Sequence, residues 1–149
     1  MRAVLTRVQS ASVTVDGQIT GQTGRGYLVL LGIAPADGPA QVEKLAKKVC
    51  GMRIFEDETG KMNRSLADVN GELLVVSQFT LFADCKKGNR PSFTGAAGPD
   101  LAIPLYEAFL DACTRLGFPP QHGIFGAHME VASVNDGPVT IWLDTDVLM

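Results

Sequence analysis

Two short runs contain the groups with which this chain could do chemistry. The first, Ser77-Gln78-Phe79-Thr80, brings polar side chains into an apolar, strand-like stretch over residues 73–82. Ser and Thr commonly bond to nearby backbone, but a buried Gln needs several hydrogen-bond partners. A strand end that presents N–H groups and hydroxyls can polarise a carbonyl, and this oxyanion stabilisation requires no titrating side chain.

The second run is Asn135-Asp136-Gly137-Pro138-Val139-Thr140. Strand-like segments over 128–134 and 139–144 flank its Gly-Pro pair. Asn, Asp, Gly and Pro between apolar runs are typical of a turn, so the local pattern favours a hairpin at Gly137-Pro138. Two unusual segments in one small chain indicate a site.

The common catalytic and metal-binding motifs are absent. No GxSxG elbow, HExxH, Walker loop or GxGxxG fingerprint occurs. The histidines are His122, expected to be exposed in a proline-rich turn, and His128, expected near the start of a strand. The three cysteines are too widely spaced for a zinc site, and we expect Cys50 and Cys113 in the core and Cys85 in a polar loop. We therefore expect neither metal nor cofactor, and a triad built on Ser77 is a minor alternative.

The composition limits the class of protein. A length of 149 residues with 46 % hydrophobic residues suits one domain, 1–149, with a sizeable core. No run of about 18 apolar residues could span a membrane, and the N-terminal residues lack the apolar stretch of a signal peptide. The expected location is the cytoplasm. A net charge of −3 argues against a basic field that coats nucleic acid, and we expect no DNA partner.

Local basic clusters are compatible with a grip on one small part of an RNA. One lies in the long loop 83–99, and another pairs Lys61 with Arg64. For Lys44, Lys47 and Lys48 we expect a solvated helix face, since Glu43 and the helical spacing explain them without a ligand.

The order of the elements predicts the fold class. We expect strands, a helix, strands, a second helix and final strands, which gives a single α/β domain with a mixed or antiparallel sheet and two main helices packed on it. The predicted strands cover 2–9, 11–15, 18–22, 27–33, 53–56 and 73–82, and the hairpin or turn signals are Asp16-Gly17 and Asn70-Gly71. One predicted helix begins near Pro39 and is capped by Asp37. The other covers 100–116, has a buried stripe that includes Leu116, and ends at Gly117. Residues 57–64 are expected to be a polar loop.

Several motifs together resemble those of D-aminoacyl-tRNA deacylases of the bacterial and eukaryotic type, and the resemblance covers essentially the whole chain. The matching segments are Met1-Arg2-Ala3-Val4 with Arg7, Gly60 to Ser65, Val76 to Leu81, Arg90 to Phe93, Pro104 to Glu107, Phe125 to Met129 and Asn135 to Thr140.

The resemblance implies hydrolysis of the ester between a D-amino acid, or mischarged glycine, and the terminal ribose of tRNA. It implies a homodimer with the active site at the subunit interface, where a cis Gly137-Pro138 pair, held by Arg7, reaches into the partner's pocket. Ser77, Gln78, Phe79 and Thr80 would form the catalytic segment, with backbone N–H groups near Phe79 and Thr80 polarising the carbonyl. Phe125 and Met129 would line the amino-acid end. We expect Lys86, Lys87 and Arg90 to contact the phosphates of the acceptor end.

Some alternatives remain open at this point. The attacking group is either Thr80 or a water assisted by the 2′-hydroxyl of the tRNA, and we favour the water because no general base is visible beside Thr80. An RNA-binding sensor without turnover would use the same pocket. A generic esterase would use Ser77 and a histidine, and a structural dimer would not explain Gln78 or the Gly-Pro pair.

Overall fold

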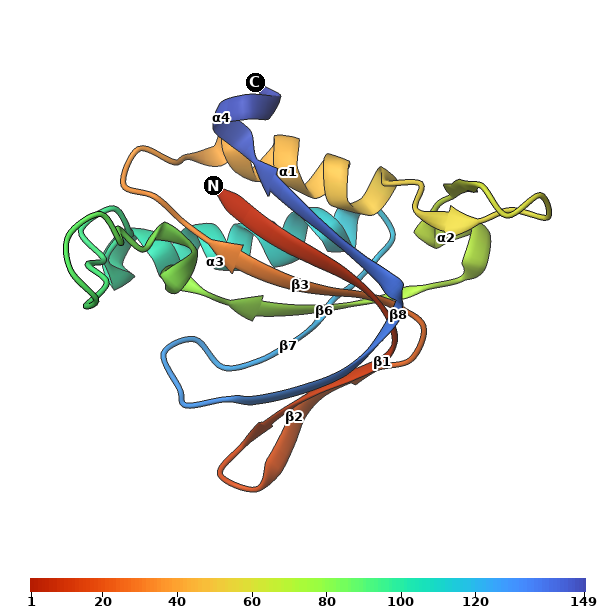
Figure 1. The fold of residues 1–149 in the computed structure, drawn as a ribbon, viewed down its shortest axis with the longest axis horizontal. Helices are drawn as coiled ribbons and strands as arrows, with labels where there is room; N and C mark the ends of the chain where they lie inside the picture. Colours follow the sequence, from red (N-terminus) through yellow and green to blue (C-terminus); the bar gives the residue numbers. More distant parts are fainter.

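The computed structural model describes the whole chain, residues 1–149. Figure 1 shows a strongly bent sheet with helices on one side and both chain ends near the same edge. In chain order the elements are β1 (Arg2–Val15), β2 (Gln18–Thr23), β3 (Gly26–Gly32), α1 (Pro39–Gly51), β4 (Phe55–Glu56), β5 (Met62–Arg64), α2 (Leu66–Val69), β6 (Glu72–Ser77), the 3₁₀ helix η1 (Phe79–Phe82), α3 (Pro99–Arg115), β7 (Gln121–His122), β8 (Glu130–Asp144) and α4 (Thr145–Leu148).

The long strand β1 organises the main sheet. The first half of β1 pairs antiparallel with β3 and the second half with β2, while β8 pairs along nearly the whole opposite edge. The strand order is β2-β1-β3-β6-β7, with β8 on β1. The parallel pairs β3–β6 and β6–β7 are joined by crossovers that contain α1 and α3.

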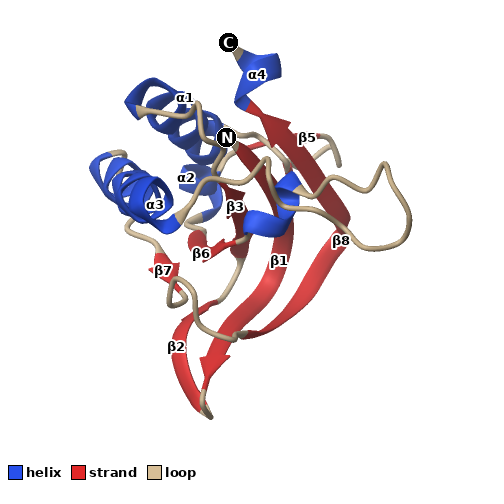
Figure 2. Cartoon of the chain, turned by 90° about the vertical axis from the view of Figure 1, so that its left-hand side faces the viewer, coloured by secondary structure: helices blue, strands red, loops and turns tan.

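Both crossover helices pack on the same face of the sheet (Figure 2). The larger core lies between them and the sheet, and Leu45, Val49 and Phe109 are fully buried there. A smaller core, which includes Val8, Val13 and Leu74, fills the concave side of the bent sheet. This arrangement confirms the predicted class, a mixed α/β fold with two main helices on a sheet. None of the helices combines the length and the apolar character needed to cross a membrane.

Several predicted turns are confirmed because their chemistry is local. Asp16 and Gly17 have φ of 49° and 77°, as expected for the two central residues of a tight hairpin turn. Asn70 adopts the left-handed conformation at the end of α2, and Gly117 has φ of 99° just after α3. Cys50 and Cys113 are buried and Cys85 is exposed, as expected.

The predicted hairpin turn at Gly137-Pro138 is wrong. β8 continues through this pair, and both of its halves pair with β1. The register changes from Thr6↔Thr140 to Val8↔Asn135, so residues 136–139 bulge from the ladder opposite Arg7. The physical reason is that β1 offers one long edge to both halves, so the chain bulges instead of turning back.

Five local predictions also need correction. The strand predicted over 73–82 ends at Ser77 because the chain enters η1 at Phe79. The Gln78 N–H makes the last bond to β3, to Leu31 O at 2.7 Å. The two strands predicted over 2–9 and 11–15 are one continuous strand, because β8 pairs across the junction.

The other three corrections concern the start of α1, the loop that follows it and the end of α3. Asp37 does not cap α1, because its carboxylate accepts bonds from the α-ammonium of Met1 at 2.8 Å and from the Ala34 N–H at 2.7 Å. The N-cap is Gly38. Residues 57–64 are not merely a loop, because β4 and β5 pair there. Leu116 is 39 % exposed because it lies at the C-cap, beyond the buried stripe of α3.

Candidate active site

The end of β6 and the start of η1 form the first half of the site. The first backbone hydrogen bond of η1 runs from the Leu81 N–H to Gln78 O, at 3.3 Å. The N–H groups of the two preceding residues, Phe79 and Thr80, therefore have no partner inside the turn. The Gln78 side-chain amide donates to Thr80 Oγ1 at 2.6 Å. Two backbone donors and a positioned hydroxyl therefore lie together, an arrangement that can bind a developing oxyanion.

A pocket of about 270 Å³ opens beside this turn. Its walls come from the ends of β3 and β6, the start of α3 and the segment between β7 and β8. The lining residues are mostly apolar and include Ser77, Gln78, Phe79, Phe125, His128, Met129 and Val131. The structure thus brings together five of the residues that the sequence singled out, from two distant segments of the chain. Thr80 joins them through its bond to Gln78.

Aromatic packing fixes the walls of the pocket. Phe125 lies against Tyr106, with ring centroids 5.8 Å apart, and Phe79 meets Phe93 edge to face at 5.0 Å. The Tyr106 hydroxyl donates to Val75 O at 3.2 Å, and burial raises its pKa to about 12, so the group remains a neutral donor. The pocket wall is therefore anchored to β6 from behind.

His128 and Val131 line the pocket although the sequence analysis gave neither of them a role. Only the position of His128 next to Met129 could have indicated its place. No hydrogen bond joins His128 to Ser77, and the ring nitrogen of the other histidine, His122, lies 2.7 Å from Gly123 O. The nucleophile–base contact of a serine triad is therefore not formed. No cluster of three or more potential metal-ligating His, Cys, Asp or Glu side chains occurs.

The bulge in β8 forms a second feature, at a distance from the pocket. The Gly137–Pro138 peptide bond is cis, Gly137 has φ of 135°, and both residues are exposed. The buried Arg7 supports them: its Nε donates to Asp136 O at 3.0 Å, and its Nη1 donates to Ile54 O at 2.7 Å. Neither Gly137 nor Pro138 lines the pocket of its own chain.

The three cations predicted to contact tRNA lie in the loop between η1 and α3. Lys86, Lys87 and Arg90 are exposed, and an isolated bridge between Asp84 and Ser92 closes this loop at its base. The loop directly follows η1, and its ribbon lies at the end of the molecule where β3 and β6 end (Figure 1).

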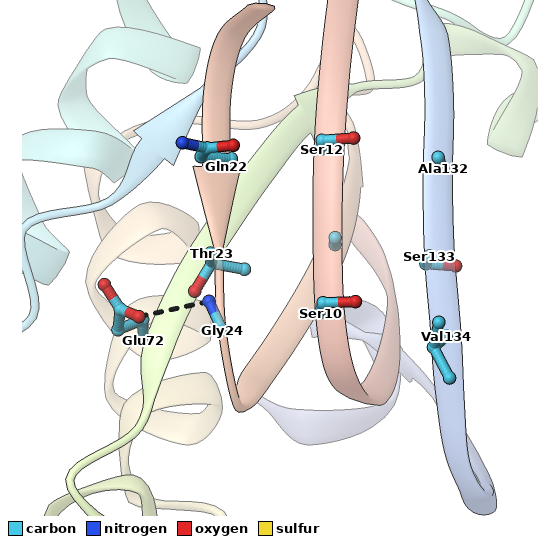
Figure 3. Close-up of a pocket in the computed structure, with 10 residues that line it drawn as sticks. Ser10, Ser12, Gln22, Thr23, Gly24, Glu72, Ala132, Ser133 and Val134 are labelled. Carbon is cyan, nitrogen blue, oxygen red and sulfur yellow. Dashed lines mark hydrogen bonds between the residues drawn. The ribbon is translucent and has the colours of Figure 1, made fainter.

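A larger hollow of about 650 Å³ lies elsewhere, over β1, β2 and β8 (Figure 3). It presents hydroxyls from Ser10, Ser12 and Ser133, and the carboxylate of Glu72 at its edge accepts a bond from the Gly24 N–H at 3.1 Å. It contains neither a histidine nor a second carboxylate for proton transfer. Its size alone therefore does not make it the reaction site. The smaller pocket is the better candidate because it borders the unpaired N–H groups at the start of η1.

Comparison with known proteins identifies a family. The family model for D-Tyr-tRNA(Tyr) deacylase matches residues 4–144. A protein of Opitutus terrae named D-aminoacyl-tRNA deacylase is 61 % identical over 146 residues, 97 % of both chains. One from Deinococcus radiodurans with the same name is 56 % identical over 144 residues, 97 % of this chain and 99 % of that one.

Two solved structures share the fold. One, described as c-Myc DNA Unwinding Element Binding Protein, has a TM-score of 0.91 at 44 % identity and covers 97 % of this chain and 98 % of its own. Another, described as a probable eukaryotic D-amino acid tRNA deacylase, has a TM-score of 0.82 at 16 % identity, covers 95 % and 97 % of the two chains, and supports the fold alone. The family model and the relatives together show that this chain belongs to the D-Tyr-tRNA(Tyr) deacylase family.

Proposed function

We propose that this chain is a hydrolase that cleaves the ester bond of D-aminoacyl-tRNA and releases a free D-amino acid and tRNA. The observation that carries the proposal is the exposed start of η1, where the N–H groups of Phe79 and Thr80 have no partner inside the turn and Phe79 lines a small, mostly apolar pocket. An aminoacyl ester is already activated, so polarising its carbonyl is most of what the protein must do. Such an enzyme would act in the cytoplasm, where tRNAs are used.

The working unit would be a homodimer in which each pocket receives the partner's Gly137-Pro138. Two observations support this. The bulge is exposed and lies away from the pocket of its own chain. β8 also exposes large apolar side chains that a monomer would leave in water, with Val134 52 % and Trp142 55 % exposed.

Exclusion of one configuration would then supply the chiral selectivity. Backbone carbonyls at the Gly-Pro pair would meet the α-ammonium of the substrate while the N–H groups of η1 hold the ester carbonyl. With both groups fixed, a D side chain points to open space and an L side chain meets the wall at Gly137 and Pro138. Glycine has no side chain, so glycyl-tRNA, including glycine mischarged on tRNA(Ala), would also be hydrolysed.

Water assisted by the 2′-hydroxyl of the tRNA is the attacking group that we favour. The hydrogen bond between Gln78 and Thr80 occupies the Thr80 oxygen as an acceptor, and no histidine bonds to this hydroxyl. Thr80 therefore lacks the adjacent base that would make it a nucleophile. Ser77 and Gln78 would orient the terminal adenosine, and Phe125 and Met129 would line the amino-acid end.

The loop cations Lys86, Lys87 and Arg90 would contact phosphates of the acceptor end. Their replacement by glutamine should raise KM, weaken its dependence on salt and leave kcat nearly unchanged. Competition by an equal concentration of single-stranded DNA would be weak, which also distinguishes this function from the DNA binding named for the similar structure.

The decisive experiment compares hydrolysis of D-tyrosyl-, L-tyrosyl- and glycyl-tRNA at low enzyme concentration. We expect rapid release of D-tyrosine and glycine while L-tyrosine is spared. Equal release of both tyrosine enantiomers would leave an esterase but refute the Gly137-Pro138 filter. Binding without any release would assign the pocket to an RNA sensor. Hydrolysis of small activated esters without tRNA, blocked by serine-directed reagents, would indicate the generic esterase.

A further inference from the structure

A basic hollow lies at the C-terminal end of α1, separate from the pocket. Its volume is about 390 Å³, and its lining consists of Lys44, Lys47, Lys48, Gly51, Met52 and Arg53. Four of these six residues are cationic, and no acidic residue lines the hollow. In a chain with a net charge of −3, such a concentration of positive charge requires an explanation.

The three lysines are exposed, as expected for a solvated helix face, but Glu43 does not pair with any of them. The Glu43 carboxylate pairs with Arg115 of α3. None of the lysines in the hollow takes part in a salt bridge. The helix dipole favours a cation in the last turn and so accounts for Lys48, but Lys44 and Lys47 lie earlier in the helix.

The hollow is also preorganised at Arg53. The guanidinium of Arg53 donates to Asn63 Oδ1, so the β5 strand holds this side chain in place. An oriented guanidinium beside lysine ammonium groups suits phosphate oxygens, because a planar fork and point charges both donate to them. A polyanion with regularly spaced phosphates fits the hollow better than a single small anion, since the hollow is open and broad.

One buried side chain links this hollow to the bulge in β8. Arg53 is followed by Ile54, whose carbonyl oxygen accepts a 2.7 Å hydrogen bond from Arg7 Nη1. The same guanidinium holds Asp136 O, next to Gly137, through its Nε at 3.0 Å. The backbone at the hollow and the backbone at the Gly-Pro pair are therefore held by the same guanidinium. The C-terminal end of α1 and the end of β6 lie at opposite ends of the molecule (Figure 1).

From this geometry we infer that the hollow of Lys44, Lys47, Lys48 and Arg53 binds the phosphate backbone of the tRNA acceptor stem while the 3′ end occupies the partner's pocket. The inference rests on the proposed function. A dimer that inserts Gly137-Pro138 into the partner's pocket also brings this hollow toward the RNA that enters there. One subunit would thus hold the ester, and the other would exclude the wrong enantiomer and grip the stem.

The test uses the full-length protein and two double variants with the same change in net charge. Lys44→Gln/Lys47→Gln removes two ammonium groups and retains good helix propensity. Gln18→Glu/Gln22→Glu adds two carboxylates on exposed positions of β2, far from α1 (Figure 1). KM and kcat for D-tyrosyl-tRNA, and the anisotropy of labelled uncharged tRNA, are measured between 50 and 200 mM salt.

We expect the lysine variant to raise KM, leave kcat and D/L selectivity unchanged, and lower the slope of log K against log salt by about 1.8, or about 0.9 per phosphate contact. Its affinity loss between the two salt concentrations should then be about 12-fold smaller than that of the unaltered protein, from the same relation. The β2 variant should change neither the salt dependence of KM nor that of tRNA binding measured by anisotropy. Arg53→Gln should act in the same direction as the lysine variant.

Other outcomes would overturn the inference. An unchanged slope in the lysine variant, with normal hydrolysis, would refute the hollow as an RNA site and leave the proposed function intact. If the unaltered protein hydrolysed no D-aminoacyl-tRNA, the proposed function would fail, and the anisotropy slopes would still decide on the hollow. Displacement of tRNA by polyglutamate as efficiently as by unlabelled tRNA would assign the hollow to an acidic protein partner.

Discussion

Replacing Gly137 by alanine tests whether the bulge in β8 takes part in the proposed reaction. A Cβ at this position would lie 2.9 Å from Val139 Cγ2 and 3.0 Å from Arg7 Nη2. Arg7 cannot move easily, because Nε and Nη1 of the same guanidinium are already bonded to Asp136 O and Ile54 O. The φ of 135° is also a region that L residues rarely adopt. Such strain costs about 1–3 kcal/mol.

This energy must appear in one of two measurable quantities. If Gly137→Ala retains the bulge, the free energy of unfolding falls by about 1–3 kcal/mol, and Tm falls by about 2–12 °C at a fixed protein concentration. If the bulge relaxes instead, the competent conformation is disfavoured by the same energy, and kcat/KM for D-tyrosyl-tRNA falls about 5- to 150-fold. Thermal unfolding and single-turnover hydrolysis measure the two quantities.

Gly117→Ala is the matched control. Gly117 also has a positive φ, 99°, but no atom lies within 4 Å of a Cβ built there. It should lose stability through backbone strain and retain full activity and selectivity. The reasoning would be refuted if Gly137→Ala matched the unaltered protein in both Tm and kcat/KM, or if Gly117→Ala changed the ratio of D to L hydrolysis.

Three further predictions concern single side chains. Thr80→Ala should retain kcat within about tenfold, since the attacking group is water, and a loss beyond about 100-fold, the scale of a missing catalytic proton transfer, would make Thr80 a direct participant. Tyr106→Phe removes the bond to Val75 O and should lower the free energy of unfolding by about 1 kcal/mol, measured by denaturant unfolding; no loss would show that the bond contributes nothing. The hydrogen bond from Thr59, with others from the same hairpin, lowers the pKa of Asp57 from 3.8 to about 2. Because the folded pKa is depressed, this stabilisation of the hairpin is present above about pH 4 and is lost as the pH falls toward 2; NMR titration should show this, and a normal Asp57 pKa would contradict it.

The parts of the fold that sequence could predict are those set by neighbouring residues. Asp16-Gly17 and Asn70 need positive φ for their turns, and α3 shows its apolar stripe within one element. The two main helices and their places among the strands followed from such signals, whereas the short helices α2, η1 and α4 were not predicted. Asp37 shows the limit, because the α-ammonium of Met1 takes the carboxylate that local sequence assigned to a helix cap.

The course of β8 was not predictable from its own residues. A run that contains Asn, Asp, Gly and Pro has the composition of a hairpin turn, and locally nothing contradicts it. The deciding fact is that β1 presents 14 residues of edge, so both halves of β8 gain more by pairing with β1 than with each other. That preference depends on a strand more than a hundred residues away in the sequence.

The candidate site divides in the same way. Ser77 and Gln78 stand out as polar residues at the end of an apolar strand, whereas His128 reaches the pocket only through the tertiary fold. The place of Gly137 was even harder to predict from local sequence, since one chain has its pocket at the end of β6 and its Gly-Pro bulge elsewhere on the sheet. An exclusion filter must touch the substrate. If Gly137 is the filter, the functional site therefore requires a second copy of the chain, and the exposed apolar side chains of β8 are where that copy would pack.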